Sequence, residues 1–133
     1  MVNAVHKGKR GENEFCSFLN VHFDINLERE YNQASGSSSD IVWAPYFLFE
    51  IKRREQLDFY NWWMQIRNSQ KAYKKQTGNY IMPVVAFHQN RKQWEFLLPA
   101  SLIGVETQFI HVDKFVFVNF VRNYLENFKD DQN

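Results

Sequence analysis

The segment Ser39–Arg54, S-D-I-V-W-A-P-Y-F-L-F-E-I-K-R-R, contains two short apolar runs, one on each side of Pro45. Two such runs around a proline turn favour a β-hairpin. If the turn is centred on Pro45, Asp40 faces Glu50 across the two strands. Directly opposed residues have Cβ atoms roughly 4.5–5.5 Å apart. Two carboxylates that close repel each other unless one is protonated or a cation lies between them.

The spacing of Glu50 and Lys52 adds an amine to this carboxylate pair. Strand periodicity places both on one face, with Phe49 and Ile51 on the other. Carboxylates are ligands that Mg²⁺ prefers, and a bound Mg²⁺ activates water and neutralises charge on a phosphate. Asp40, Glu50 and the backbone carbonyl of Ile51 are therefore candidate metal ligands. Lys52 is a candidate for orienting the water or stabilising the developing negative charge. The pattern indicates metal-dependent cleavage of a phosphodiester.

A third acidic residue, Glu12, follows Gly11 near the start of an expected helix. Gly8 and Gly11 precede an amphipathic pattern that ends at about Phe23. Glu12 is expected to approach the same end of the sheet and to bind the metal directly or through water. Taken singly, these residues have simpler explanations. A carboxylate there is typical of a helix N-terminus, and a lone Glu-x-Lys is typical of an exposed charge pair.

The remaining pattern predicts a mixture of helices and strands in one domain, residues 1–133. Residues 1–7 are expected to form a flexible arm and residues 129–133 a frayed tail. The expected elements are a strand Asn26–Gln33, a loop Ala34–Ser39, a helix Leu57–Gln76 ended by Gly78, a hairpin of Ile81–Gln89 and Gln93–Leu98, a helical turn Pro99–Ile103 and a helix Lys114–Phe128 capped by Asp113. The last segment, rich in Phe and Val, also favours a strand. It is expected to form core or a dimer interface, with an aromatic platform for single-stranded DNA as the alternative.

Composition excludes several classes of protein. The single Cys16 cannot form an intramolecular disulfide, and the four scattered histidines lack zinc-ligand spacing. No apolar run approaches the roughly 20 residues that span a bilayer, and there is no apolar signal core, so we expect a cytoplasmic protein. The net charge is only +1, but basic residues occur in local groups. Local charge of this kind is sufficient for nucleic-acid contact.

The motifs together resemble the PD-(D/E)XK nuclease superfamily and, within it, archaeal and phage Holliday-junction resolvases. The resemblance covers about residues 7–99 and lies in four segments in the family's order: K-G-K-R-G-E at Lys7–Glu12, A-S-G-S at Ala34–Ser37, S-D-I-V at Ser39–Val42 and F-E-I-K-R-R at Phe49–Arg54. It maps Glu12, Asp40 and Glu50 to the acidic catalytic residues and Lys52 to the catalytic lysine. Ser39 stands where the name-giving proline would be.

This resemblance implies an α/β fold with a restriction-endonuclease-like core. A mixed central sheet would be flanked by helices in the order α-β-β-β-α-β-β, followed by a C-terminal segment. It implies a Mg²⁺-dependent endonuclease, with Mn²⁺ as a substitute, that acts as a homodimer on four-way or branched DNA. Gln65 would be an accessory polar residue near the metal.

Candidate DNA contacts flank these motifs. They are Lys7, Lys9, Arg10, Ser35, Ser37, Arg53 and Arg54. The backbone N–H groups of Gly8–Gly11 are a further candidate for phosphate binding. The serines are equally typical of a plain connector. Two other functions remain open: a nuclease of the same fold that acts on other DNA in repair or restriction, and a nucleic-acid-binding module without catalysis.

Overall fold

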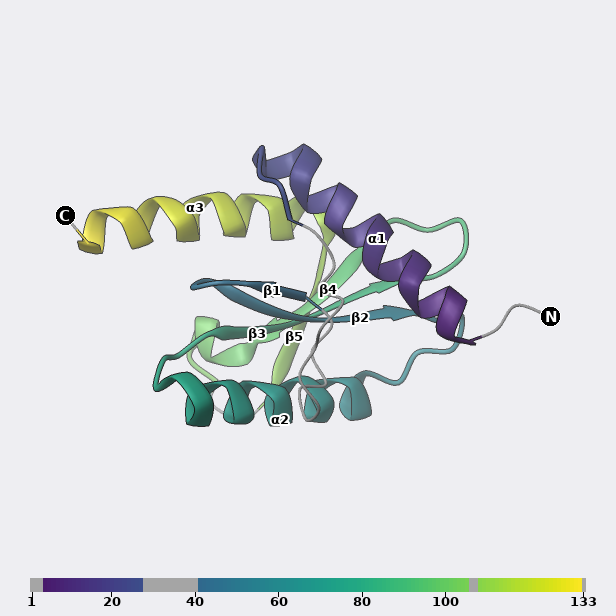
Figure 1. The fold of residues 1–133 in the computed structure, drawn as a ribbon, viewed down its shortest axis with the longest axis horizontal. Coiled ribbons are helices and arrows are strands. Elements are labelled where there is room, and N and C mark those ends of the chain that lie inside the picture. Colours follow the sequence, from purple (N-terminus) through teal and green to yellow (C-terminus); the bar gives the residue numbers. More distant parts are fainter. Residues whose placement is uncertain (1–3, 28–40, 106–107, 133) are drawn as a thin grey trace.

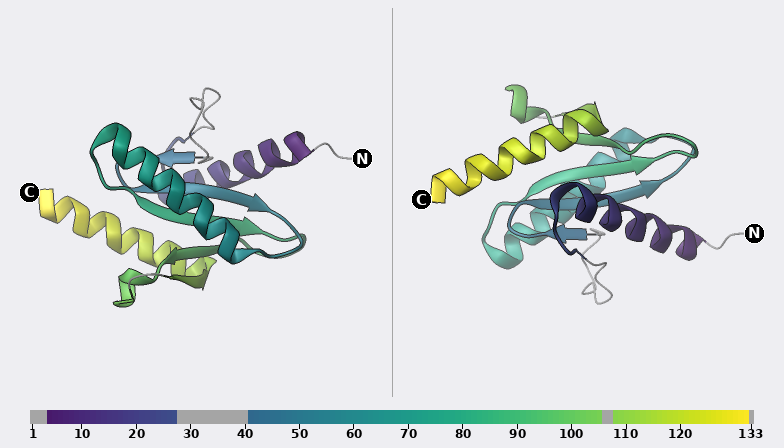
Figure 2. Two further views of the ribbon diagram at one scale, coloured as in Figure 1. Left: turned by 90° about the horizontal axis from the view of Figure 1, so that it is seen from below. Right: turned by 90° about the horizontal axis from the view of Figure 1, so that it is seen from above.

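The computed structural model describes residues 4–27, 41–105 and 108–132. The elements are α1 (Ala4–Phe23), β1 (Ile41–Trp43), β2 (Phe47–Arg53), α2 (Phe59–Thr77), β3 (Met82–His88), β4 (Glu95–Pro99), a 3₁₀ turn η1 (Ala100–Ile103), β5 (Phe109–Asp113) and α3 (Lys114–Gln132). Helices α1 and α3 cover one face of the sheet and α2 covers the other (Figures 1 and 2). The predicted α/β class, a mixed sheet flanked by helices, is confirmed.

The five strands form one sheet in the order β1-β2-β3-β4-β5. Strands β2 and β3 are parallel, and the other neighbouring pairs are antiparallel. A parallel pair needs a crossover connection, which α2 supplies. This connection brings α2 over the face of β2 that carries Glu50 and Lys52.

The first hairpin has the register that its sequence predicts. Trp43 pairs with Phe47 and Ile41 pairs with Phe49, so the pairing is symmetric about Pro45. The turn is closed by the Tyr46 N–H, which donates to the Trp43 carbonyl at 2.8 Å. Asp40 lies outside the described residues, so the predicted pairing with Glu50 is not tested.

Two apolar layers hold the sheet between its helices. Residues at alternate positions of β2 face opposite layers, as strand geometry requires. The layer under α1 and α3 contains Phe15, Leu19, Phe47, Phe49, Ile51, Phe96 and Phe117. The layer under α2 contains Leu48, Trp62, Trp63, Ile66, Val85 and Phe87. Strand β3 is central and buried on both faces, as predicted for its Val84–Phe87 run.

Most of the later elements were also predicted. Gly78 ends α2 in the left-handed conformation at φ 75°, and its N–H donates to the Lys74 carbonyl at 2.7 Å. Strands β3 and β4 form the predicted hairpin. The Val116 N–H donates to Asp113 Oδ1 at 2.8 Å, so Asp113 caps α3. The helical alternative for residues 114–128 is therefore confirmed.

Several boundaries differ from the prediction. Helix α1 begins at Ala4, inside the predicted arm, and α3 continues to Gln132 through the predicted tail. Gly8 and Gly11 do not prevent the helix from beginning before them, because a glycine in a helix interior costs only about 1 kcal/mol relative to alanine. The start of the predicted strand at Asn26 is irregular, and Leu27 bonds through its backbone to the Asn20 side chain. Residues 28–39 of that strand and loop lie outside the described residues.

Strand β5 was not predicted. Phe109–Asp113 pairs along its whole length with β4 and forms one edge of the sheet. None of its residues is fully buried, so its apolar pattern is weaker than that of a core strand. No helix within the described ranges is long and apolar enough to cross a bilayer.

Candidate active site

Glu50 and Lys52 lie together near the end of β2, on the face that α2 covers. Lys52 Nζ is 3.3 Å from Glu50 Oε1. The Glu50 side chain is only 7% exposed and that of Lys52 14%. Phe49 and Ile51 point into the opposite layer, so the predicted division of the strand between its two faces is confirmed. A carboxylate this deeply buried in an apolar layer is unusual, because burial of a charge is costly unless it is paired.

The end of β2 is paired on one side within the described chain. Residues Glu50–Arg53 pair with Val85–His88 of β3. On the other side, the described part of β1 ends opposite Phe49. The carboxylate and amine therefore lie where the described ladder between β1 and β2 stops.

Helix α1 approaches the same end of β2. A Cβ built on Gly11 would lie 3.5 Å from Arg53 Cβ and 3.8 Å from Ile51 Cγ2. Glu12, the next residue, is half-buried. Helix α1 packs on the Ile51 face, however, whereas Glu50 is on the α2 face. A contact between Glu12 and Glu50 therefore stays a prediction.

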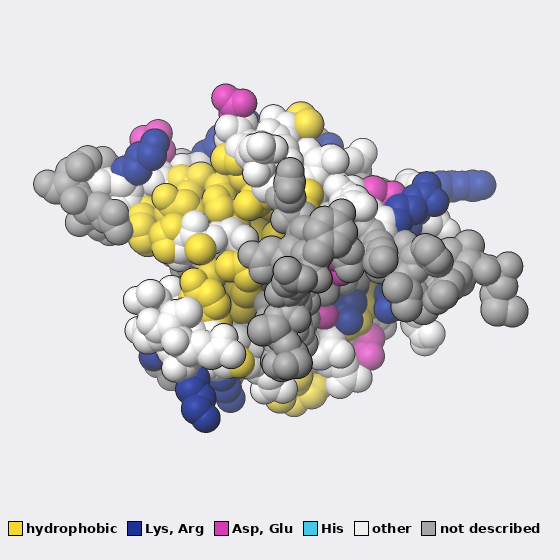
Figure 3. All heavy atoms as spheres, in the orientation of Figure 1, with side chains coloured by type: hydrophobic (Ala, Val, Ile, Leu, Met, Phe, Trp, Pro, Cys, Tyr) yellow, Lys and Arg dark blue, Asp and Glu magenta, His cyan; other side chains and the backbone are white. Residues whose placement is uncertain are grey.

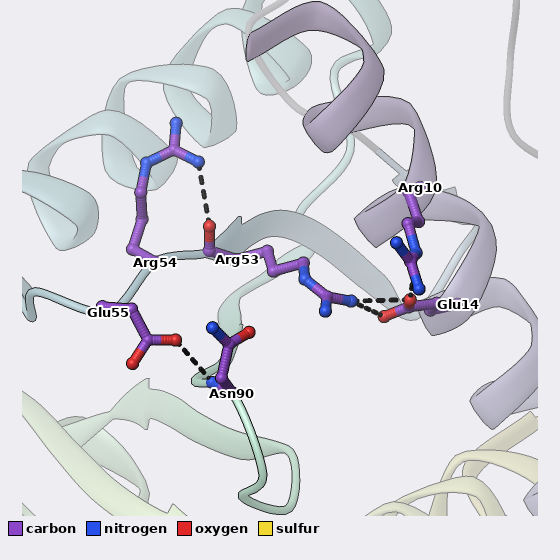
Figure 4. A network of polar contacts seen from close by, with 6 residues as sticks. All are labelled: Arg10, Glu14, Arg53, Arg54, Glu55 and Asn90. Atoms are coloured by element: carbon purple, nitrogen blue, oxygen red, sulfur yellow. Dashed lines mark hydrogen bonds and ion pairs between the residues drawn. The ribbon is translucent and has the colours of Figure 1, made fainter. Parts of the chain in front are cut away.

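Arg53 is bound to helix α1 (Figure 4). Its Nη1 lies 2.6 Å from both carboxylate oxygens of Glu14. Arg10 Nε also donates to Glu14 Oε1, at 3.2 Å. Two of the candidate DNA-binding cations thus share one carboxylate on α1. Their contact with DNA stays a prediction.

The loop after β2 is tied to the turn between β3 and β4. Arg54 is exposed and donates to the Arg53 carbonyl at 3.1 Å. The Asn90 N–H donates to Glu55 Oε1 at 2.7 Å, and Gln89 Nε2 donates to the Glu55 carbonyl at 2.7 Å. The same loop lines a surface depression of about 520 Å³. It is lined by Arg54, Gln56, Leu57, Asp58 and Trp62.

The remaining predicted site residues lie on α1 and α2 or outside the described residues. Gln65 is exposed on α2, whereas Trp62, Ile66 and Ser69 are the buried residues near it. The N–H groups of Gly8–Gly11 lie inside α1 rather than at its start, so their predicted role as a helix-terminal phosphate site is wrong. Asp40, Ser35 and Ser37 lie outside the described residues, as do the side chains of Lys7 and Lys9.

The donor set favours a hard cation. In the Glu50–Lys52 pair the only metal-ligating group with oxygen atoms is the Glu50 carboxylate, and neither residue offers an imidazole or a thiolate. Oxygen ligands suit Mg²⁺, and thiolates or imidazoles would suit zinc. The described ranges contain no group of three acidic, histidine or cysteine side chains suited to a metal. A Mg²⁺ site at Glu50 would therefore depend on Asp40, on Glu12 or on backbone oxygens.

Two residues that organise this region, Glu14 and Glu55, were not identified from the sequence. Glu14 contacts a residue 39 positions away, and Glu55 contacts one 35 positions away. Neither pair has a local signal, because helix and strand periodicity report only on near neighbours. An acidic residue two positions after Glu12 and three adjacent cations at Lys52–Arg54 were the available hints.

No family model matches the chain, and no curated protein matches it. Among solved structures, it is similar to Hjc, a Holliday junction resolvase from the archaeal hyperthermophile Archaeoglobus fulgidus. The two chains are 19% identical, the TM-score is 0.46, and the match covers 83% of this chain and 86% of the other. The similarity concerns the course of the backbone.

Proposed function

We propose that this protein is a metal-dependent endonuclease that hydrolyses phosphodiester bonds in DNA. The observation that carries the proposal is the buried pair of Glu50 and Lys52, 3.3 Å apart where the described β1–β2 ladder stops. A buried carboxylate beside an amine provides both a cation ligand and a donor to a phosphate oxygen. A purely structural role does not require a buried carboxylate and an amine side by side near the end of a strand.

Asp40 completes the proposed metal site. The hairpin register is symmetric about Pro45 from Trp43 to Ile41. If it continued by one residue, position 40 would lie opposite Glu50. Asp40, Glu50 and the Ile51 carbonyl would hold Mg²⁺ or Mn²⁺, with Glu12 as a further ligand, directly or through water. When bound, the ion would supply an activated water and neutralise charge on the phosphate. Lys52 would donate to a non-bridging phosphate oxygen.

The preference for branched DNA is the finer part of the proposal. It rests on the four sequence segments that resemble archaeal and phage Holliday-junction resolvases. A resolvase of this kind would act as a homodimer, so that two sites cut two strands of one junction. Arg53, Arg54 and the N-terminal cations would support substrate binding, and Gln65 would be an accessory polar residue near the metal.

A cleavage assay with three substrates tests the proposal. The wild-type protein is incubated with Mg²⁺ and a labelled four-way junction, a linear duplex or a nicked duplex. We expect cleavage of the junction in preference to the others. Equal cutting of all three would reject the resolvase function and leave a general nuclease. Binding without cutting in Mg²⁺ and Mn²⁺ would identify a non-catalytic module.

Site variants test the residues. Asp40→Asn and Glu50→Gln should each abolish cleavage while junction binding in EDTA remains. Glu126→Gln, which removes an exposed carboxylate from α3, is the matched control and should cut normally. Near-full activity of either site variant would reject the metal assignment.

A further inference from the structure

Helix α2 has a charge pattern that the candidate active site does not use. Its 19 residues include Arg67, Lys71, Lys74 and Lys75 but no aspartate or glutamate. The first three are spaced i, i+4 and i+7, so they lie along one side of the helix. Lys71 and Lys74 are exposed and Arg67 is half-buried. In Figure 3, dark-blue side chains project at the C-terminal half of α2, with no acidic side chain visible beside them.

These three cations line a pocket. Its volume is about 290 Å³, and its other lining residues are Gln70, Tyr80, Pro99 and Ser101. The pocket therefore combines three positive charges with two hydroxyls and a carboxamide, and its lining contains no acidic residue. The Gln70 side chain donates to the Ile81 carbonyl at 3.0 Å, which fixes α2 against the start of β3.

The charges are not compensated within the described structure. The ion pairs found there join Arg10 and Arg53 to Glu14, Lys52 to Glu50 and His111 to Glu95. None of the described ion pairs includes Arg67, Lys71 or Lys74. Three like charges on one side of a helix repel one another, so an anion in the pocket would be stabilised.

The spacing fits a nucleic-acid backbone. Seven residues separate Arg67 from Lys74, which is about 10 Å along a helix. One DNA strand carries a charge about every 3.4 Å of duplex axis, so this length matches about three phosphates. A single small anion would need fewer cations and a shorter row.

The pocket is also at a useful distance from the candidate active site. Tyr80 precedes Val85, the β3 partner of Glu50, by five residues. At about 3.3 Å per residue this is about 17 Å, or about five base pairs of duplex. Both regions lie on the α2 side of the sheet.

We propose that the pocket of Arg67, Lys71 and Lys74 binds the phosphate backbone of a DNA duplex arm about five base pairs from the bond that is cut. The proposal rests on the proposed function in naming DNA as the anion. The pocket would contribute affinity and orientation without base contacts, since Lys and Arg contacts to phosphates position a duplex and do not read its sequence.

Binding in EDTA tests the pocket apart from catalysis. The probes are a fluorescein-labelled four-way junction and a 30-base-pair duplex, measured by anisotropy at several salt concentrations. The variant is Lys71→Ala/Lys74→Ala, and the matched control is Arg122→Ala/Lys129→Ala, which removes two exposed cations from α3 on the opposite face. Alanine is the best helix former, so neither variant should unfold its helix.

We expect the α2 variant to bind both probes about tenfold to sixtyfold more weakly than the wild type at 0.1 M salt. The slope of the logarithm of the binding constant against the logarithm of the salt concentration should be smaller in magnitude by about 1.8. The control variant should bind almost as the wild type does. Equal binding by wild type and α2 variant would overturn the proposal, as would an equal loss in the control or no salt-dependent binding by the wild type. Poly-L-glutamate bound as tightly as DNA through the same lysines would overturn the choice of DNA. If the wild type cleaves DNA but the α2 variant binds it as tightly as the wild type, the pocket proposal fails and the nuclease proposal stands. If the α2 variant binds DNA more weakly but the wild type does not cleave it, the pocket proposal stands and the nuclease proposal fails.

Discussion

Arg53 Nη1 lies 2.6 Å from both carboxylate oxygens of Glu14, although the two residues are 39 positions apart in the chain. The pair joins helix α1 to the last residue of β2, directly after Lys52. Its Arg53 side chain is 17% exposed, so this contact is better shielded from water than a surface ion pair. It fixes the helix that carries Glu12 against the strand that carries Glu50.

Glu14→Gln should therefore destabilise the protein. Gln keeps the shape but loses the charge, and we expect the free energy of unfolding to fall by about 1–2 kcal/mol, because Glu14 itself is a third exposed. Urea unfolding measures the change. Glu126→Gln on α3 is the control and should unfold like the wild type. An equal urea midpoint for Glu14→Gln would show that the pair contributes nothing.

The hairpin could be predicted from sequence because its signals are local. Pro45 marks the turn, and the apolar runs on both sides fix a symmetric register that the structure has from Trp43 to Ile41. The burial of Phe49 and Ile51 on one face follows from the two-residue period of a strand. The Glu50–Lys52 pair was found for the same reason.

Contacts between distant segments could not be predicted in this way. The pairing of Glu14 with Arg53 depends on how α1 crosses the sheet, which no local period reports. Strand β5 was missed because its residues are only partly buried at an edge. The α2 pocket had a local signal, the absence of any acidic residue from Phe59 to Thr77, but its walls at Tyr80 and Ser101 come from other segments.

Gly11 provides a test of the packing between α1 and β2. A Cβ at this position would make ordinary contacts, at 3.5 and 3.8 Å, with Arg53 and Ile51. Gly11→Ala should therefore fit and raise the free energy of unfolding by up to about 1 kcal/mol, because alanine favours the helix. Gly11→Leu should lower it, because a larger side chain must push α1 away from the strand.

Thermal or urea unfolding of both variants checks this prediction. A destabilised Gly11→Ala would mean that the helix lies closer to β2 than an alanine allows. A stable Gly11→Leu would mean that the interface between α1 and β2 is loose.

The Glu50–Lys52 pair should show strong coupling in a double-mutant cycle. Lys52→Met removes the amine from a nearly buried carboxylate, and we expect a loss of about 3 kcal/mol in the free energy of unfolding. Glu50→Gln/Lys52→Met should recover most of this loss, because the carboxylate that the Lys52 amine balances is then also removed. Urea unfolding of the two single variants and the double variant measures the coupling. Additive effects would contradict a direct interaction in the folded protein.

His22 should make stability depend on pH. Burial, and then the positive charges of Lys114 and Arg122, lower the pKa of His22 below its ordinary value of 6.5. The unfolded chain therefore binds the proton more readily than the folded one. Stability should be highest above about pH 6.5 and should fall as the pH drops from 6.5 through the lower folded pKa.

Urea unfolding between pH 7.5 and 5.5 measures this dependence. His22→Gln should lose less stability over that interval than the wild type. Added salt should reduce the part of the His22 pKa shift that is due to the charges of Lys114 and Arg122, and it should leave the part that is due to burial. Parallel pH profiles for wild type and His22→Gln would contradict the assignment.

Divalent cations should stabilise the folded protein if Asp40 and Glu50 bind them. A ligand that binds only the folded state adds RT ln(1 + [L]/Kd), which is about 1.4 kcal/mol at ten times Kd. Mg²⁺ or Mn²⁺ should therefore raise the melting temperature of the wild type and of Glu126→Gln, and EDTA should reverse the shift. Glu50→Gln and Asp40→Asn should show no shift.

If Asp40→Asn kept the shift while Glu50→Gln lost it, the ion would be held without Asp40, and the continuation of the hairpin register to position 40 would be wrong. Because this measurement needs no DNA and no turnover, it separates the metal site from the choice of substrate.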